Sequence, residues 1–420
     1  MKDILEIIKP SKKESDKVKS ITSLFIKKLN SKLKYAEAIL GGSGAKGTWL
    51  SGDHDIDIFV LFDYKRYSAK SDQLSEILEP ILKKVFPKIK IEKVHGSRDY
   101  FKTTYQNFNL EIVPILKINK AEQAINITDI SPLHSRWVNK HDKKIKNEIR
   151  LIKQFCKANN LYGAESYISG FSGYVLEILT INYGSFEALL KASQKWGNKE
   201  IVDPSKFYTK KTALFHINNS KLQSPIIIVD PVDKNRNAAA ALSNEKYLLF
   251  RKLAKEYLKK PSKNLFQKEI INLDKLNREA EQKKQNIVFL QLDALKGKED
   301  VVGSKLLKVF NHLERKLTQF DIKRSGWRWK ENKEENEAIM FFLLAKKELP
   351  KFELRAGPPL KMKEFVKDFK KKNKDAFQEN GKIYAKIKNK NPKLEDFMKN
   401  LIRDDYVKER VKKIKEVIIF

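Results

Sequence analysis

The most constraining feature of this chain is a strand-like run that carries two carboxylates on one face. Asp55 and Asp57 alternate with isoleucines at the start of the apolar run 56–62 (IDIFVLF), a pattern typical of a buried β-strand. Side chains alternate along a strand, so both carboxylates project from one face while the isoleucines pack on the other. Two carboxylates about 7 Å apart repel each other unless a cation lies between them. The pattern therefore predicts a cation site built on a β-sheet.

Two Mg²⁺ ions are the simplest cations for such a site. Mg²⁺ takes oxygen ligands in octahedral geometry and keeps open positions for substrate phosphates. A third carboxylate is then expected from a neighbouring strand, and Glu111 in LEIVPIL is the only acidic residue in a downstream strand-like run of this region. The alternative for Asp55 and Asp57 is a pair of exposed charges on an edge strand. Asp53 suits a turn or helper role better than a ligand role.

A Gly-rich segment, GGSGAKG at 41–47, precedes the acidic strand by about a dozen residues. Its spacing matches the G-x-G-x-x-G dinucleotide fingerprint, but that fingerprint must open a helix, and the acidic strand follows too soon to leave room for one. It is not a P-loop either, because Lys46 precedes Gly47 instead of following it. A turn with backbone N–H groups, the Ser43 hydroxyl and Lys46 suits a triphosphate whose metals are held by the next strand.

The chain changes character along its length. Up to about residue 135, helical patterns at 14–36 and 71–86 alternate with strand patterns at 56–62, 89–94 and 109–116, which indicates an α/β unit. A mostly helical region with one short buried strand at 226–231 follows. The prediction is an α+β multidomain protein with three domains, namely an α/β domain at 1–135, a helical central domain at 136–260 and a C-terminal region at 261–420.

The C-terminal region has an order of its own. Between residues 286 and 388 the patterns follow β-α-β-β-α-β, the split βαβ arrangement of many RNA-binding modules. The helix KMKEFVKDFKKK and the strand GKIYAKIK supply its last two elements, and the chain is expected to close with a basic helix over 395–418. Because this order serves many unrelated functions, it supports RNA binding only together with the charge.

The chain is strongly basic, with 86 Lys and Arg against 53 Asp and Glu and a formal net charge of +33. An excess of this size is typical of a protein with a polyanionic partner. A membrane binder would concentrate its charge in one amphipathic helix or juxtamembrane cluster, whereas here Lys is spread along the whole chain. Nucleic acid is therefore favoured over a membrane. The alternative is a lysine-rich proteome, in which Lys replaces other residues on solvated faces.

Several other classes of protein are excluded by composition. The single cysteine, Cys156, excludes a disulfide scaffold and a Cys-based zinc site. No apolar run approaches the roughly 18 residues of a membrane span, and the N-terminus lacks the apolar core of a secretory signal. The expectation is a soluble protein of the reducing cytoplasm.

Together these motifs resemble the polymerase-β-like nucleotidyltransferase superfamily, and within it the archaeal (class I) CCA-adding enzymes, which are tRNA nucleotidyltransferases. The resemblance begins in GGSGAKGTWLSGDHDIDIFVLF and continues, in the expected order, through LEIVPIL, TDISPLHSRWV, NEIRLIKQFCKANNLYGAESYISGFSGYVLEIL, DPVDKNRNAAAALS and RAGPPLKM. It implies template-independent addition of C, C and A to the 3′ end of tRNA from CTP and ATP, with Mg²⁺ as cofactor and release of pyrophosphate. It also implies a homodimer.

The resemblance assigns roles position by position. It matches the metal-binding carboxylates to Asp55, Asp57 and Glu111, residues at the nucleotide phosphates to Ser43 and Lys46, further nucleotide contacts to His134, Lys153 and Tyr162, and an arginine that helps to choose the base to Arg236. There are departures. The family often has Asp at the position of Glu111. It frequently has Arg at the position of Lys46, so the ammonium group of a lysine replaces a guanidinium that could bind a phosphate through two N–H groups.

The residues alone leave alternatives open. Lys153 could instead be a solvated lysine on an amphipathic helix. Tyr162 could be an aromatic residue of the core, and His134 could cap or pack the start of a helix. Arg236 also fits a salt bridge in its turn, with Asp230 or Asp233. At the level of function, the rivals are a poly(A)-type or oligoadenylate-type RNA-terminal transferase, and a non-catalytic tRNA-binding chaperone.

Overall fold

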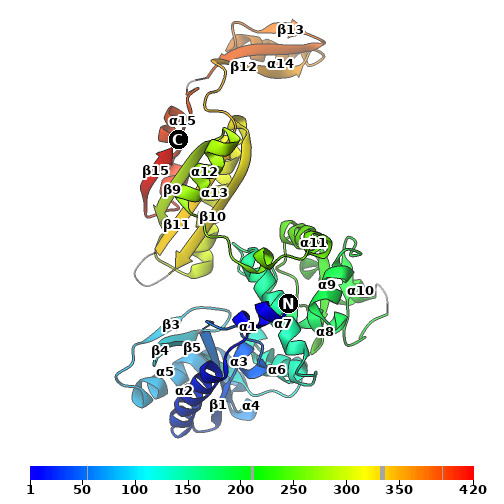
Figure 1. Ribbon diagram of the computed structural model, residues 1–420, viewed down its shortest axis with the longest axis vertical. Coiled ribbons are helices and arrows are strands. Elements are labelled where there is room, and N and C mark those ends of the chain that lie inside the picture. Colours follow the sequence, from blue (N-terminus) through cyan, green and yellow to red (C-terminus); the bar gives the residue numbers. More distant parts are fainter. Residues whose placement is uncertain (54, 210–211, 332–335, 390) are drawn as a thin grey trace. The chain divides into compact units, whose positions relative to one another are not determined.

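The chain folds into two compact units, Met1–Glu269 and Ile270–Phe420, each with its own hydrophobic core. The computed structural model, drawn in Figure 1, describes residues 1–53, 55–209, 212–331, 336–389 and 391–420. No helix in these ranges combines the length and the apolarity that a bilayer span requires.

The first unit begins with a five-stranded sheet in the order β1-β2-β5-β4-β3. At its centre β2 (Asp55–Phe62) and β5 (Phe108–Leu116) run parallel, and their register places Asp57 beside Glu111. The other three strands extend the sheet in antiparallel pairs, β1 (Ala36–Leu40), β4 (Tyr100–Tyr105) and β3 (Ile91–Val94). The predicted strands are confirmed, and β1 and β4 are additional.

Two helices cover one face of this sheet. α2 (Lys12–Asn30) and α5 (Leu74–Val85) bury their apolar residues against Ile56, Ile58 and Val60 of β2. Because side chains alternate along β2, the carboxylates of Asp55 and Asp57 lie on the other face. The predicted helix 14–36 ends early, at Asn30, because the chain turns there to enter β1. The predicted helix 71–86 begins later, at Leu74, after a 3₁₀ segment.

The Gly-rich segment forms a helix, which corrects the expectation of a turn. α3 (Gly42–Lys46) has five residues and ends at Gly47, whose φ of 65° is left-handed. A helix fits before the acidic strand because it is only slightly more than one turn long.

The rest of the first unit is mostly helical, as expected. Its core joins residues of α7, α8, α9 and α11 with the first helix of the chain. A small sheet, β6-β7-β8, lies among the helices, and its middle strand is the predicted one. The elements are α1 (Lys2–Ile8), α4 (Tyr64–Tyr67), α6 (Ser131–Asn139), α7 (Ile145–Ala158), α8 (Gly173–Tyr183), α9 (Phe186–Ser193), β6 (Glu200–Val202), α10 (Ala213–His216), β7 (Ile226–Asp230), β8 (Asp233–Asn237) and α11 (Asn244–Lys259).

The second unit contains a four-stranded antiparallel sheet in the order β10-β11-β9-β15. Its elements follow the split βαβ order, so the predicted architecture is confirmed. They are α12 (Leu273–Lys283), which precedes the motif, then β9 (Asn286–Asp293), α13 (Glu299–Leu317), β10 (Ile322–Glu331), β11 (Asn336–Leu344), α15 (Leu394–Leu401), α16 (Asp405–Lys408) and β15 (Lys413–Ile419).

Two assignments within this architecture were wrong. The segment 395–418 is not one closing helix, because its last part forms β15, which pairs with β9 and completes the sheet. The predicted last helix and strand, α14 (Lys363–Lys372) and β14 (Lys382–Lys388), belong to a different sheet. That sheet has the order β12-β14-β13 and is inserted between β11 and α15; its other strands are β12 (Phe352–Pro359) and β13 (Phe377–Glu379).

Candidate active site

The three predicted carboxylates lie on the face of the five-stranded sheet opposite to α2 and α5. Asp55 and Asp57 come from β2, and Glu111 stands beside Asp57 on β5. Burial and the negative charges of Glu111 and Asp55 raise the pKa of Asp57 to about 6, while Lys46 opposes this shift. Repulsion of this kind is relieved when a cation binds between the carboxylates. The donor set and its charge therefore fit a divalent metal ion.

The three carboxylate groups do not converge on one position where a metal ion could bind. Glu111 Oε1 forms an ion pair with Lys102 Nζ of β4 at 3.0 Å, and Asp55 Oδ1 lies 3.4 Å from Asn109 Nδ2. In the described part of the chain, no three His, Cys, Asp or Glu side chains are grouped closely enough to hold a metal ion. Binding would require Glu111 to leave Lys102 and turn toward Asp57, its neighbour in register.

The start of α3 lies directly against this acidic face. Gly42 has a left-handed φ of 51°, and a Cβ atom at this position would stand 1.6 Å from Asp57 Oδ2. Ser43 lines a small hollow that it shares with Gly44, Asp53 and Asp55. The structure thus brings the predicted phosphate-binding serine and the predicted metal-binding carboxylates together.

Replacing Gly42 by Ala is expected to lower kcat for the activity that the sequence predicts about 10- to 100-fold, because the new methyl group must displace the Asp57 carboxylate and strain the backbone. Gly44→Ala is the matched control. A Cβ atom at Gly44 would lie 3.3 Å from the nearest atom of Leu40, and its φ is not left-handed. Steady-state kinetics of both variants check this prediction, and equal activity of the two would contradict it.

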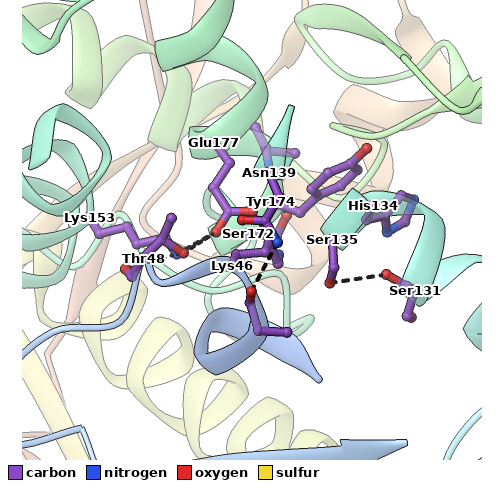
Figure 2. A network of polar contacts seen from close by, with 12 residues as sticks. Lys46, Thr48, Ser131, His134, Ser135, Asn139, Lys153, Ser172, Tyr174 and Glu177 are labelled. Carbon is purple, nitrogen blue, oxygen red and sulfur yellow. Dashed lines mark hydrogen bonds and ion pairs between the residues drawn. The ribbon is translucent and has the colours of Figure 1, made fainter. Parts of the chain in front are cut away.

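A buried cluster follows at the end of α3. Glu177 of α8 accepts hydrogen bonds from Lys46 Nζ, Lys153 Nζ and Thr48 Oγ1, each at 2.7 Å. Figure 2 shows the Glu177 side chain pointing toward all three donors. The side chains of Glu177, Lys153 and Lys46 are 0%, 4% and 10% exposed, so the alternative of a solvated Lys153 is wrong.

The charges of this cluster are strongly coupled. Burial alone would raise the pKa of Glu177, but Lys153 and Lys46 lower it to about 2. Burial lowers the pKa of Lys153, and Glu177 opposes this shift. Two ammonium groups share one carboxylate, so the cluster carries one positive charge in excess. That excess suits an anionic ligand.

A second buried carboxylate organises the other predicted residues. Asp230, at the end of β7, pairs with Arg236 and with His134 Nε2 at 3.0 Å, and it accepts a hydrogen bond from the Tyr174 hydroxyl at 3.1 Å. The His134 ring stacks on Tyr174 with 3.9 Å between ring centroids. Burial lowers the pKa of His134, so this imidazole favours the neutral form. The salt bridge considered for Arg236 does form, with Asp230.

Tyr162 lies at the edge of the first cluster. A Cβ atom on Gly173 would stand 2.7 Å from its hydroxyl, and Lys157 Nζ lies 5.1 Å from the centroid of its ring. Lys157 is also paired with Asp53 at 2.7 Å, which fits the helper role expected for that carboxylate. Burial raises the pKa of the Tyr162 hydroxyl.

Two residues at the site, Arg150 and Glu177, were missed at the level of sequence, and Asp230 was considered only as a salt-bridge partner of Arg236. Arg150 of α7 donates to the carbonyls of Gly47 and Trp49, at 2.6 Å and 3.0 Å, and so fixes the segment after α3. Glu177 and Asp230 are both fully buried. Glu177 did leave a signal, because it is a single carboxylate within the apolar run GYVLEIL, just as Glu111 is within LEIVPIL.

Three family models match the chain in order. They are a nucleotidyltransferase domain at 23–123, the second domain of tRNA nucleotidyltransferase at 147–267, and the C-terminal domain of CCA-adding enzyme at 285–418. The CCA-adding enzyme of Nanoarchaeum equitans is 35% identical over 382 residues, which are 90% of this chain and 90% of that protein. The chain belongs to the archaeal (class I) CCA-adding enzymes. The CCA-adding enzyme of Methanocaldococcus jannaschii is 30% identical over 96% of this chain and 90% of that protein.

Solved structures give the same fold. A cytoplasmic RNA terminal U-transferase matches with a TM-score of 0.50 and 14% identity, over 64% of this chain and 97% of that chain. Likeness at this identity shows the fold alone. Together with the nucleotidyltransferase domain model, it confirms the expected superfamily and fold class of this CCA-adding enzyme. Nucleotidyltransferases of this kind generally use divalent metal ions.

Proposed function

We propose that this chain adds C, C and A to the 3′ end of tRNA, taking the nucleotides from CTP and ATP and releasing pyrophosphate. The single observation that carries this proposal is the placement of the β2–β5 carboxylates beside a buried basic cluster, in a chain that belongs to the CCA-adding enzymes. CCA-adding enzymes act on tRNA with CTP and ATP.

The metal in this proposal is Mg²⁺, held by Asp55, Asp57 and Glu111. Burial, together with repulsion from Glu111 and Asp55, raises the pKa of Asp57, and this supports the set, as does the all-oxygen character of the donors. When bound there, the ions neutralise triphosphate charge and lower the pKa of the tRNA 3′-hydroxyl. Glu111 has a longer side chain than the Asp that is more frequent at this position. The extra length allows its carboxylate to leave Lys102 and bind the metal instead.

The remaining work is done by positioning and by charge. Lys46 and Lys153 offer ammonium N–H groups to the triphosphate, and the Ser43 hydroxyl donates from the start of α3. His134 and Tyr162 add further contacts to the nucleotide. No general base other than a metal-ligating carboxylate is required.

A single site must accept both CTP and ATP, because the first unit has one set of β2–β5 carboxylates. Discrimination then depends on hydrogen bonds to the base edges. We assign this role to Arg236, whose side chain is 29% exposed although its guanidinium is paired with Asp230. A side chain held at one end and open at the other can donate to a base.

Replacing Arg236 by Ala is expected to change the ratio of CTP to ATP efficiency about 10- to 100-fold, because one donor to the base is lost. The measurement is kcat/KM for each nucleotide on tRNA that ends before the first C. Asp230 keeps its contacts to His134, Tyr174 and the Val232 amide, so the fold is retained. If kcat/KM falls by the same factor for both nucleotides, or for neither, Arg236 only forms a salt bridge and does not choose the base.

An addition assay tests the proposed function. Purified protein is incubated with labelled CTP or ATP and tRNA that lacks its 3′ CCA. Ordered addition of two C residues and one A is expected. A long homopolymer would favour a poly(A)-type or oligoadenylate-type transferase, and tight tRNA binding without incorporation would favour the chaperone.

Three further expectations belong to this proposal. The division into 1–135, 136–260 and 261–420 is supported by the order of the three family models. Location in the cytoplasm is supported by the tRNA substrate. The homodimer is tested by sedimentation of the purified chain.

A further inference from the structure

We propose that Glu177 is a positioning residue that holds Lys46 and Lys153 together, so that both ammonium groups serve one triphosphate. This inference rests on the proposed function and deepens it. It concerns a residue that touches neither the carboxylates of the sheet nor, in this proposal, the substrate.

The two carboxylate oxygens of Glu177 contact two different parts of the first unit. Its Oε2 atom binds Lys46, which ends α3 beside the catalytic sheet, and its Oε1 atom binds Lys153 of α7. Thr48 completes the arrangement, because its hydroxyl donates to Oε1 and lies 3.0 Å from Lys153 Nζ. One carboxylate therefore links the catalytic segment to the helical part (Figure 2).

Stability alone does not account for a carboxylate at this place. A buried ionic cluster can often be replaced by well-packed apolar side chains without loss of stability. Glu177 is surrounded in sequence by apolar residues of α8, and four of its neighbours are fully or almost fully buried; they are Val175, Leu176, Ile178 and Leu179. An ionic group kept in such a helix indicates a role for its charge and its position.

The net charge of the cluster points to an anion. With two ammonium groups and one carboxylate, the cluster has an excess of positive charge in a site that is almost closed to water. Lys46 also lies close enough to Asp57 to oppose the effects of burial and of Glu111 on its pKa. A triphosphate bound beside the sheet would meet this excess charge.

Without the Glu177 carboxylate the two ammonium groups repel each other at close range, and no shared acceptor holds them together; Lys153 keeps only its contacts to Thr48. They then separate, or Lys153 gives up its proton, since it is deeply buried. In either case one of the two contacts to the triphosphate is lost. A lost charge-assisted hydrogen bond weakens binding about 10- to 100-fold.

The test replaces Glu177 by Gln, which keeps the shape and removes the charge. The expected result is that KM for CTP and KM for ATP rise by the same factor, about 10- to 100-fold. The Kd of inorganic tripolyphosphate, measured by direct binding to the purified protein, rises by a similar factor, while the Kd for tRNA does not change. Unchanged or tighter tripolyphosphate binding would overturn the proposal.

A second variant, Glu177→Asp, separates position from charge and covers the case in which Gln prevents folding. Asp keeps the negative charge but is too short to reach both ammonium groups. The tripolyphosphate constant is expected to rise in this variant too, less than for Gln. If Glu177→Asp binds tripolyphosphate normally, Glu177 only compensates charge and the proposal fails.

Asp129→Asn is the matched control for the loss of a buried carboxylate. Asp129 is fully buried and paired with Arg98, and its other hydrogen bonds come from the backbone amides of Leu116, Ile125 and Asn126. Its replacement is expected to lower the melting temperature without changing the tripolyphosphate constant. Failure of the proposed function would be distinct, because the wild-type protein would then add no nucleotide. Tripolyphosphate binding by the wild type and its two Glu177 variants would still report on the cluster.

Discussion

Replacing Asp57 by Asn is expected to lower the rate of nucleotide addition about 1,000-fold or more. Asp57 stands between Asp55 on its own strand and Glu111 on the next, so it is the central member of the carboxylate set. The amide keeps the shape of the side chain but removes the charge that attracts a divalent cation. Asp55→Asn is expected to have an effect of the same size. Single-turnover incorporation of labelled CMP measures both.

The affinity for tRNA is expected to remain near that of the wild type in these variants, because it depends mostly on phosphate contacts elsewhere. Asp53→Asn is the matched control, because Asp53 precedes β2 and forms an ion pair with Lys157. It should retain most of the addition rate. Near-normal turnover in Asp57→Asn or Asp55→Asn would overturn the assignment of the metal site.

Removing residues 270–420 is expected to weaken tRNA binding about 100-fold or more and to reduce its dependence on salt. The segment is one compact unit with its own core, so the cut at Glu269 leaves the first unit entire. The unit carries basic surface, including three exposed lysines at the end of α14. The reason for the effect is that each phosphate contact releases counterions from the RNA.

Filter binding at several salt concentrations measures this effect on the affinity and on the salt slope. A matched variant of the full chain replaces Lys370, Lys371 and Lys372 by Ala. It is expected to reduce the slope by up to about one unit for each lysine that contacts a phosphate. If the truncated protein keeps both the affinity and the slope, the second unit serves folding or dimerisation and not tRNA binding.

Local patterns were sufficient for the elements that carry the catalytic carboxylates. The alternation of Asp and Ile in β2 and the single acid within LEIVPIL predicted both central strands, because period-two burial is a property of neighbouring residues. Short strands were harder to find. β1 has five residues and β4 is rich in polar side chains, so neither shows a strong period of its own.

The C-terminal region shows where local patterns fail. The order β-α-β-β-α-β was right, yet its last helix and strand were assigned to α14 and β14 when the sheet uses α15 and β15. Each segment has the propensity of a helix or a strand, but propensity does not choose a partner. The choice depends on the pairing of β15 with β9, in which Lys413 lies opposite Asp293, and this pairing spans the whole inserted three-stranded sheet.

The sequence by itself determined the acidic strand, the Gly-Ser segment before it, the helical middle region and the basic character of the chain. These features depend on composition, or on the spacing of residues that are neighbours in the sequence, and therefore need no knowledge of the tertiary fold. Only the tertiary structure decided which groups meet. Glu177 joins Lys46 and Lys153 across 131 and 24 positions, and Asp230 joins His134 across 96. A buried carboxylate and its cationic partner are brought together by packing, so the partner cannot be read from the segment in which the carboxylate lies.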